Sequence, residues 1–173
     1  MKKLALSLAA MFTLSLCKAQ GSFSGSSKLF SIGVGVGSPF FGSGYKQALP
    51  VNPTINFEKG VSDNISAGAS ISYAGSKLEV YDLKYNAFLI GARAAYHFIP
   101  GNEKIDAYAG GGLGYVIVSV SSKSSGYATA ASSGIGYMAF AGGRYYFTKA
   151  TAVYAELGYS SLSFLNAGIT FKF

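Results

Sequence analysis

From residue 29 to the final phenylalanine, apolar side chains alternate with small or polar ones in eight separate segments. A period of two is typical of β-strands whose two faces meet different environments. The chain also has 13 tyrosines, 13 phenylalanines and 23 glycines, which suit strands joined by tight turns. The pattern therefore predicts an all-β chain with strands over residues 29–37, 51–58, 65–74, 85–98, 105–120, 135–147, 152–160 and 164–173.

The connections between these segments alternate in length. Short turns are expected over residues 59–64, 99–104 and 148–151, and longer loops over residues 38–50, 75–84 and 121–134. The last connection, 161–163, is short and departs from the alternation. An even number of strands, with short turns at one end and long loops at the other, is typical of a barrel in the bacterial outer membrane.

Composition and charge exclude several other classes of protein. A membrane-spanning helix needs ~20 consecutive apolar residues, and the longest largely apolar run, residues 4–16, is too short. Charged residues make up 12% of the chain, about half of the ~25% in a typical soluble domain, which argues against an ordinary soluble enzyme. Beyond the N-terminus the basic residues are scattered singly. No cluster could follow a phosphate backbone, so we expect no binding to nucleic acid.

The first 19 residues have the parts of a secretory signal peptide. Lys2 and Lys3 form the positive start, residues 4–16 form the apolar region, and the expected cleavage follows Ala19 or Gln20. The sequence therefore predicts export through the Sec pathway.

The mature chain is expected to begin with a flexible Gly/Ser-rich lead-in over residues 20–27, followed by the β-domain over residues 28–173. Cys17 is the only cysteine, and a lipoprotein signal would acylate it. Leu16 is larger than the residue that such a signal has before its cysteine. If the signal peptide is cleaved after residue 19 or 20, the mature chain has no cysteine and forms no disulfide.

Alternation alone does not say which face is inside. A soluble β-protein buries its apolar face, whereas a membrane barrel turns this face to lipid. Aromatic residues on the apolar face gather at two levels and predict the two aromatic girdles of a membrane barrel. At the short-turn ends they are Phe57, Tyr96, Phe98, Tyr145, Phe147, Phe171 and Phe173, and near the long loops they are Tyr73, Tyr115, Tyr137 and Tyr159.

The last eight residues form a strand that ends flush with the chain. A polar residue, Asn166, is followed by Gly168 and then by Phe171 and Phe173. This end resembles the C-terminal assembly signal of outer-membrane barrels, which the barrel-assembly machinery reads during biogenesis.

With its signal peptide, eight strands, the segments 142–148 (GGRYYFT) and 156–159 (ELGY) and the terminal Phe173, the chain resembles the small outer-membrane β-barrel family. That family includes the OmpA transmembrane domain and OmpX-like proteins, often labelled porin-family proteins. The resemblance implies an eight-stranded antiparallel up-and-down transmembrane β-barrel in the bacterial outer membrane. It also implies a monomer surrounded by outer-membrane lipids. Full-length OmpA has a C-terminal peptidoglycan-binding domain with no counterpart in this sequence, so an anchoring role is not expected.

The interior of an eight-stranded barrel is only wide enough for side chains to fill it. Four aromatic side chains are expected to project inward, and glycines are expected to make room for them. The aromatic residues are Tyr108, Phe140, Tyr146 and Tyr154, and the glycines are Gly35, Gly68, Gly110 and Gly142.

Seven ionisable residues also fall on the inward face, all toward the short-turn half: Glu58, Arg93, His97, Asp106, Arg144, Glu156 and Lys172. A buried charge without a partner costs several kcal/mol, so we expect them to pair. The turn lengths predict Arg144 opposite Glu156 and His97 opposite Asp106, because cross-strand partners have Cβ atoms ~5 Å apart. The prediction is a structural polar network, and the alternative is a gate that responds to protons or ions.

No catalytic, metal or cofactor site is expected. Some eight-stranded barrels act on lipid A with a histidine and a serine at the outer leaflet. Here the only histidine, His97, is placed at the periplasmic end with no serine nearby. One histidine and dispersed carboxylates form no metal-ligand set. The glycine-rich run 110–114 lacks the lysine and hydroxyl residue of a phosphate loop.

The long loops are the candidates for binding a surface ligand, because tyrosine, serine, glycine and lysine suit adaptable contacts. Exposed candidates are Phe40, Phe41, Tyr45, Lys46, Lys77, Tyr81 and Tyr127. The sequence predicts an integral outer-membrane barrel with a structural or surface-interaction role. Two alternatives stay open: a narrow channel for small solutes, and a secreted soluble barrel that binds an apolar ligand.

Overall fold

The computed structural model describes residues 22–37, 46–47, 51–78, 83–122, 130–159 and 162–173. These residues form strands and turns. The strands are β1 Lys28–Val36, β2 Lys46–Gln47, β3 Asn52–Ser62, β4 Ile65–Leu78, β5 Leu83–His97, β6 Ile105–Ser122, β7 Ala130–Tyr146, β8 Thr151–Tyr159 and β9 Leu165–Lys172. Within these ranges, no helix has the length and apolar character needed to cross a membrane.

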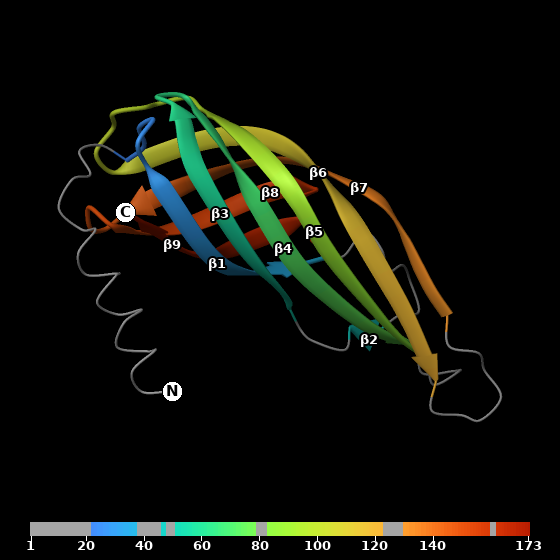
Figure 1. Cartoon of the computed structure of the whole chain (residues 1–173). Helices are drawn as coiled ribbons and strands as arrows, with labels where there is room; N and C mark the ends of the chain where they lie inside the picture. The colour runs from blue at the N-terminus through green and yellow to red at the C-terminus, as the bar shows by residue number, and fades with distance from the viewer. Residues whose placement is uncertain (1–21, 38–45, 48–50, 79–82, 123–129, 160–161) are drawn as a thin grey trace, which may run out of the picture.

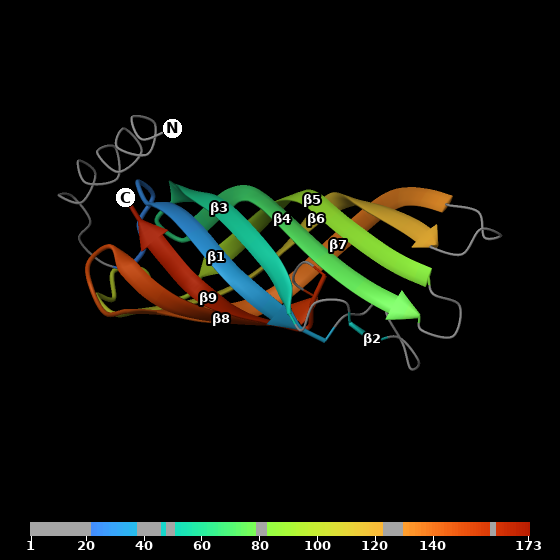
Figure 2. The same ribbon diagram turned by 90° about the horizontal axis from the view of Figure 1, so that it is seen from below.

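The eight long strands close into an antiparallel barrel. Each pairs with its neighbour in the sequence, and β1 pairs with β9 to complete the ring, as Figures 1 and 2 show from two directions. Every one of the eight predicted segments corresponds to one of these strands, so the predicted all-β barrel is confirmed. The two-residue β2 was not predicted; it pairs with β4 through Lys46 and Lys77.

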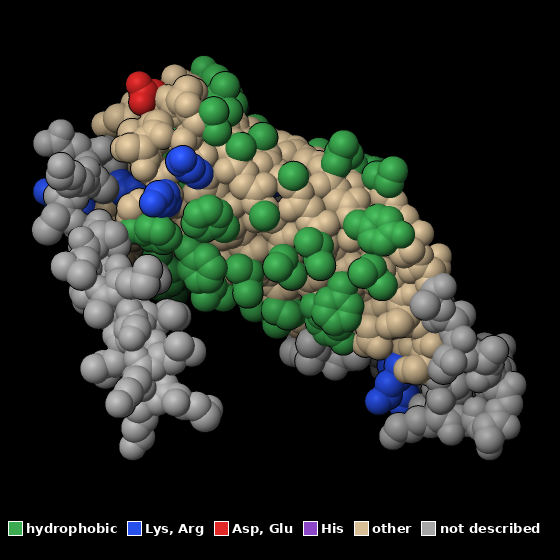
Figure 3. All heavy atoms as spheres, in the orientation of Figure 1, with side chains coloured by type: hydrophobic (Ala, Val, Ile, Leu, Met, Phe, Trp, Pro, Cys, Tyr) green, Lys and Arg blue, Asp and Glu red, His purple; other side chains and the backbone are tan. Residues whose placement is uncertain are grey.

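The two faces of the wall differ as a membrane barrel requires. In β5, Leu89 is 1% exposed and points inward, whereas its neighbours Phe88 and Ile90 are 44% and 54% exposed on the outside. Hydrophobic side chains cover much of the outer surface seen in Figure 3, while charged side chains lie toward its ends. A soluble barrel with the Ile32 and Val34 face inward does not fit this arrangement, because both side chains are nearly half exposed.

The wall is not equally tall all round. Strands β4, β5, β6 and β7 have 14, 15, 18 and 17 residues, whereas β1, β3, β8 and β9 have 9, 11, 9 and 8. The taller strands extend together at the end away from the C-terminus (Figure 1). We call this the long-loop end, and the opposite end, where β1 begins and β9 finishes, the short-turn end.

The extra height corrects two predicted loops. Residues 75–78 and 83–84 continue β4 and β5, which stay paired to Leu78 and Leu83. Residues 121–122 and 130–134 likewise belong to β6 and β7. These segments contain serine, glycine and alanine, which suggested loops. In the barrel they pair with a long neighbouring strand, and the hydrogen bonds of that pairing satisfy their backbone groups even though their side chains have little preference for strands.

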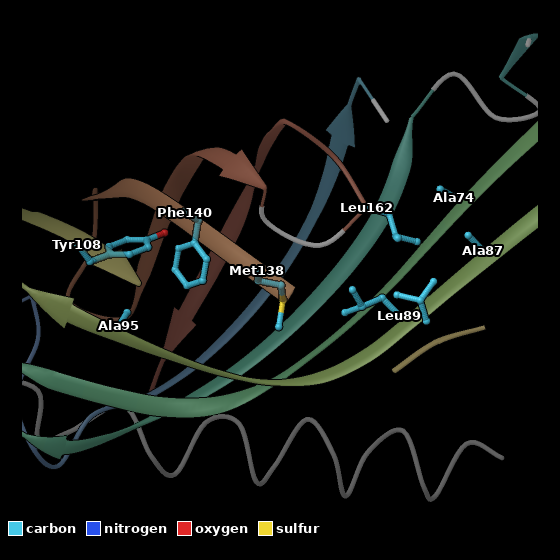
Figure 4. Packing of buried hydrophobic residues seen from close by; sticks show 9 residues of the cluster. Ala74, Ala87, Leu89, Ala95, Tyr108, Met138, Phe140 and Leu162 are labelled. Carbon is cyan, nitrogen blue, oxygen red and sulfur yellow. The ribbon is translucent and has the colours of Figure 1, made fainter. Parts of the chain in front are cut away.

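The lumen has two zones. An apolar cluster, part of which is labelled in Figure 4, lines the long-loop half and reaches Ala95, which lies between Arg93 and His97 in β5: Ala74, Ala87, Leu89, Ala95, Tyr108, Val116, Met138, Phe140 and Leu162. Toward the short-turn end the lumen contains buried charged side chains. Tyr108 and Phe140 lie at the boundary, where their rings make an edge-on contact at 6.4 Å between centroids.

Candidate functional site

Six ionisable side chains meet inside the short-turn half of the barrel, and we call them the charged cluster. They come from five strands, β3, β5, β6, β7 and β8, and each occupies an inward position of the alternation. None is more than 2% exposed: Glu58, Arg93, His97, Asp106, Arg144 and Glu156. The closed ring of strands brings together residues that are up to 98 positions apart in the sequence.

Arg93 joins β5 to the opposite wall. Its Nη2 donates to Glu156 Oε1 at 2.6 Å, and its Nη1 reaches Glu156 Oε2 at 3.5 Å. Its Nη2 also lies 3.5 Å from Glu58 Oε1. The guanidinium sits over the Phe140 ring, 4.0 Å from the centroid. A two-pronged contact of this kind fixes both side chains more firmly than a single hydrogen bond would.

Arg144 bridges two carboxylates. Its Nη2 donates to Glu58 Oε1 at 2.8 Å, and its Nη1 donates to Asp106 Oδ2 at 2.9 Å. Its guanidinium lies over the ring of Tyr108, 4.0 Å from the centroid. Glu58 contacts both Arg93 and Arg144, so this carboxylate connects the ion pairs of the two arginines.

His97 completes the cluster. The hydroxyl of Ser66 donates to Glu58 Oε2 at 2.8 Å, so its oxygen is left to accept a hydrogen bond from His97 Nε2 at 3.0 Å. The Asp106 carboxylate accepts from Nδ1 at 2.7 Å. Both ring nitrogens therefore have hydrogen-bond partners inside the cluster. The two arginines and His97 thus contact the three carboxylates of the cluster directly.

The register corrects the two predicted charge pairs. Gly142 faces Glu156 across β7 and β8, and Arg144 faces Tyr154, so the predicted pairing of Arg144 with Glu156 is wrong. Glu156 instead meets Arg93 from across the lumen. A linear reading of turn lengths considers only adjacent strands, whereas a closed barrel also brings partners together from opposite walls.

The other predicted pair is also displaced in register. His97 faces Tyr108 across β5 and β6, and Asp106 faces Arg144 across β6 and β7. The His97 and Asp106 side chains nevertheless reach each other diagonally. Diagonal neighbours on one face of a sheet lie within reach of long side chains.

Ser66, His97 and Asp106 contact one another in the order of a serine–histidine–aspartate triad. The expectation that no serine lies near the histidine is therefore wrong, because Ser66 belongs to the neighbouring strand β4. The proton arrangement differs from that of a triad. In a triad the serine donates to the histidine, whereas here it donates to Glu58 and accepts from His97.

The N-terminal residues 22–27 cover the cluster at the short-turn end, and we call them the strap. Ser22 N donates to Asn102 O at 2.6 Å, and its hydroxyl donates to Ile105 O at 3.0 Å. Phe23 is 2% exposed and stacks on the His97 ring, with centroids 3.5 Å apart and planes at 4°.

The other end of the strap is held by the last residues of β3 and the turn that follows them. Gly60 N donates to Ser27 O at 2.7 Å, and Gly25 N donates to the Asp63 carboxylate at 3.1 Å. A Cβ at position 60 would lie 2.3 Å from the Ser24 carbonyl oxygen, so the close approach requires glycine. Residues 22–27 of the expected lead-in thus pack against the barrel, and the small side chains of most of them allow this close approach. Phe23 was the only signal in the sequence that could have indicated this.

The other predicted lumenal residues also face inward. Tyr108, Phe140, Tyr146 and Tyr154 are 1–5% exposed. Lys172 is buried with its Nζ over the Tyr146 ring, 4.9 Å from the centroid. A Cβ at Gly142 would lie 3.1 Å from the Tyr108 ring, and one at Gly110 would lie 2.8 Å from the Phe140 ring. Glycines at these positions therefore make room for the aromatic side chains.

The predicted girdle residues lie on the outer face. Those more than 40% exposed are Phe57, Tyr96, Phe98, Tyr115, Tyr137, Tyr145 and Phe147, while Tyr73, Tyr159, Phe171 and Phe173 are partly exposed. Tyr137 and Tyr159 stack with centroids 5.1 Å apart. In the C-terminal strand, Asn166 points into the lumen, Gly168 faces Gly33 across β1, and Phe171 faces Phe30. Recognition of this strand by the assembly machinery stays a prediction.

Several predicted features lie outside the described residues. They are the signal peptide with Cys17, the side chain of Lys46, and the loop candidates Phe40, Phe41, Tyr45, Tyr81 and Tyr127. Lys77 is described and lies in β4. In the part of the chain that is described, no group of three or more histidine, cysteine, aspartate or glutamate residues could hold a metal ion.

Comparison with known proteins agrees with this architecture. The family model for the outer membrane protein beta-barrel domain matches residues 5–172. A comparison with curated proteins finds no match.

Three solved barrels illustrate the likeness of fold. The N-terminal β-barrel domain of Pseudomonas aeruginosa OprF has 18% identity and a TM-score of 0.58, with 89% of this chain and 100% of that chain covered. P. aeruginosa OprG has 12% identity and a TM-score of 0.57, with 90% and 99% covered. Ail, the attachment invasion locus protein of Yersinia pestis, has 15% identity and a TM-score of 0.51, with 85% and 95% covered. With the closed ring of eight strands and its apolar exterior, the family match identifies this chain as a member of the outer-membrane β-barrel family of bacteria.

Proposed function

We propose that this protein is a closed outer-membrane barrel that conducts no solutes and has a structural or surface-interaction role. The observation that carries the proposal is the charged cluster, which links five strands across the lumen. Arg93 and Arg144 together contact Glu58, Asp106 and Glu156 at 2.6–3.5 Å. The strap then covers the cluster at the short-turn end, which faces the periplasm in barrels of this kind.

The buried ion pairs favour a lumen that is permanently closed rather than one that opens as a gate. Opening a path along the lumen would require several charge-assisted hydrogen bonds to break together, and each charge left buried without a partner costs several kcal/mol. The aromatic rings of Tyr108 and Phe140 add to the obstruction, because each lies against an arginine. A narrow channel for small solutes would need space that these side chains occupy.

The taller wall at the opposite end supports a role at the cell surface. Strands β4–β7 are longer than the other strands and extend farther at this end (Figure 2). Ail has the same kind of fold, and its name describes attachment and invasion. Low sequence identity transfers no ligand from Ail to this chain, so the proposal is limited to presenting loops outside the cell. In this proposal the protein is exported by the Sec pathway, assembled through its C-terminal strand, and present as a monomer among lipids.

Catalysis forms no part of the proposal. Ser66 and His97 are both 0% exposed, and Phe23 lies on the imidazole. The Ser66 hydroxyl donates its hydrogen bond to Glu58 and not to His97, so the pair lacks the contact through which a general base activates a serine. A fluorophosphonate probe should leave Ser66 unlabelled in the folded protein, and labelling that disappears in Ser66→Ala would contradict this view.

The decisive experiment measures solute passage through the folded protein in lipid vesicles. Folding is first established by the change in gel mobility between unheated and boiled samples. We expect no swelling of these vesicles in isotonic arabinose and no discrete conductance steps in a planar bilayer. Steady conductance from the wild-type barrel would overturn the proposed closure and favour a narrow channel.

A further inference from the structure

The β4–β7 wall has a strand edge on each side at the long-loop end. On one side, β4 pairs with β3 only as far as Ser72, and beyond that level β2 adds to it as an antiparallel strand. On the other side, β7 pairs with β8 only as far as Ala139 but continues along β6 to Ala130 (Figure 1). Within the described ranges, residues 130–138 of β7 have no strand on their β8 side, and we call this the open edge.

The hydrogen bonds at the other end of β7 show which backbone groups face the open edge. The Tyr146 N–H donates to a carbonyl on the β6 side, whereas the Phe147 N–H donates across the turn to β8. Successive residues of a strand point their N–H and C=O groups to opposite sides, and the register of β7 shows no shift toward either neighbour. The N–H and C=O groups of Ser133, Ile135 and Tyr137 therefore point to the β8 side.

The open edge lies at the aromatic level near the long loops and beyond it. Ile135 faces Tyr115, one of the girdle tyrosines, and Ser133 follows on the loop side. Hydrocarbon offers no partner to a backbone N–H or C=O group, so this edge belongs to the aqueous side of the membrane surface. A row of backbone donors and acceptors in water is a template for another strand.

The side chains along the open edge do not oppose such pairing. Edge strands are commonly protected by charged residues, proline or a bulge. Residues 130–138 (AASSGIGYM) contain no charge and no proline, and their register with β6 is regular. Ile135 is 84% exposed, the highest value of any large hydrophobic side chain in the described residues. An uncharged edge of this kind favours a partner strand that is itself uncharged.

A cavity of about 280 Å³ lies beside the open edge and suits a side chain of an added strand. Its lining includes Val116 and Val118 of β6 and Tyr159 at the end of β8. Gly134 contributes no side chain, and a Cβ at this position would meet nothing within 4 Å. An apolar residue at the matching position of a partner strand would therefore contact the two valines.

A second copy of the chain does not suit this edge. Barrels inserted in one membrane point the same way, so β7 of every copy runs from the long-loop end to the short-turn end. Two such strands cannot lie antiparallel, whereas every strand pair in the described part of this protein is antiparallel. A segment of a different protein has no such restriction on its direction.

We propose that the open edge of β7 binds an extended, uncharged segment of another protein at the cell surface. The segment adds to the β6–β7 sheet as an antiparallel strand and places an apolar side chain in the cavity beside Gly134. Strand β2 adds to the opposite edge of the same wall in this way. The proposal rests on the surface-interaction role proposed above and names the kind of partner, and it does not depend on closure of the lumen.

Amide hydrogen exchange tests the proposal in the full-length mature protein, ¹⁵N-labelled and folded in lipid nanodiscs. The probe is a synthetic peptide in which threonine and valine alternate, with a lysine at each end for solubility. Without peptide, the Ser133 and Ile135 amides should exchange faster than those of Gly134 and Gly136, which face β6. Peptide at ten times its dissociation constant should slow the Ser133 and Ile135 amides by about tenfold. The same peptide with a proline at its centre should not slow them.

Two substitutions at one position separate the backbone from the side chain. Ile135→Pro removes an N–H from the open edge but none from the ladder with β6, and proline is tolerated where the N–H of an edge strand faces solvent. Ile135→Ala removes the side chain and keeps this N–H. Protection of the Ser133 amide by the peptide should be lost in Ile135→Pro and kept in Ile135→Ala. Equal protection in both variants would overturn the proposal. Slow exchange of Ser133 and Ile135 without peptide would also overturn it, because a second copy or another part of the chain would then cover the edge.

The role on which the proposal rests is measured separately. Ser132→Cys, treated in intact cells with a membrane-impermeant maleimide, reports whether the open edge lies outside the cell, and vesicle swelling reports closure of the lumen. Labelling of this cysteine is expected. A barrel that is labelled and closed, but whose edge amides do not respond to the peptide, would contradict strand addition alone. Absence of labelling would contradict the surface role itself.

Discussion

The two halves of the lumen are built on the same strands but contain opposite chemistry. The short-turn half is filled by six ionisable side chains, each paired and each at most 2% exposed, and the strap covers it. The long-loop half is lined by Leu89, Val116 and Met138, and part of its wall ends early. The contrast shows that alternation along a strand determines which side chains point into the lumen, whereas strand length determines how far the wall encloses them.

The largest effect is expected from breaking the charged half. Arg144→Ala leaves Glu58 and Asp106 without one of their cationic partners inside the lumen. Removing one partner of a buried ion pair costs about 3–5 kcal/mol. The free energy of unfolding, measured by urea titration in lipid vesicles, should fall by that amount. Lys149→Ala, in the exposed β7–β8 turn, is the control and should change stability by less than about 0.5 kcal/mol.

The second-largest loss of stability is expected from a change in the strap. Phe23→Ala removes a buried ring from the imidazole of His97, and truncation of a buried phenylalanine costs about 3 kcal/mol or more. The same urea titration should show this loss, and exchange of the Gly60 amide hydrogen should accelerate because its acceptor, Ser27 O, belongs to the strap. Ser26→Ala, at an exposed strap position, should leave both measurements unchanged. An unaltered Gly60 exchange rate in Phe23→Ala would mean that the ring does not hold the strap in place.

Replacing a glycine by alanine in each half of the lumen compares how tightly the two halves are packed. In the packed half, a Cβ at Gly68 would lie 1.8 Å from the backbone oxygen of Phe57. Gly68→Ala should therefore destabilise the barrel by about 1–3 kcal/mol, since the backbone must shift to relieve the overlap. Thermal unfolding of folded protein in detergent, followed by the loss of the gel-mobility difference, measures this change.

The corresponding change in the open half should have the smallest effect and the opposite sign. Gly134→Ala meets no neighbouring atom within 4 Å, and replacing glycine by alanine stabilises a compatible position by about 0.4–1 kcal/mol. Equal losses from Gly68→Ala and Gly134→Ala would show that the two halves are equally tightly packed, contrary to the structure.

Much of the fold could be predicted from the sequence because alternation is a local property. Ile32 and Val34 point outward and Ser31 and Gly33 point inward by the pleat alone, and the same rule places all seven predicted charges in the lumen. The apolar outer face needed more than the alternation, and the positions of residues such as Tyr96 and Tyr137 provided it.

The partners inside the lumen were decided only by tertiary structure. Arg93 and Glu156 are 63 residues apart, and they meet because β5 and β8 face each other across a closed ring. Turn lengths indicate neighbours along the wall but say nothing of contacts across it, so the predicted pair of Arg144 and Glu156 was wrong. The packing of the strap has the same origin. A Gly/Ser-rich segment packs against the barrel where the barrel offers it hydrogen bonds, as Gly60 and Asp63 do. That condition is not visible in the alternation of a single strand.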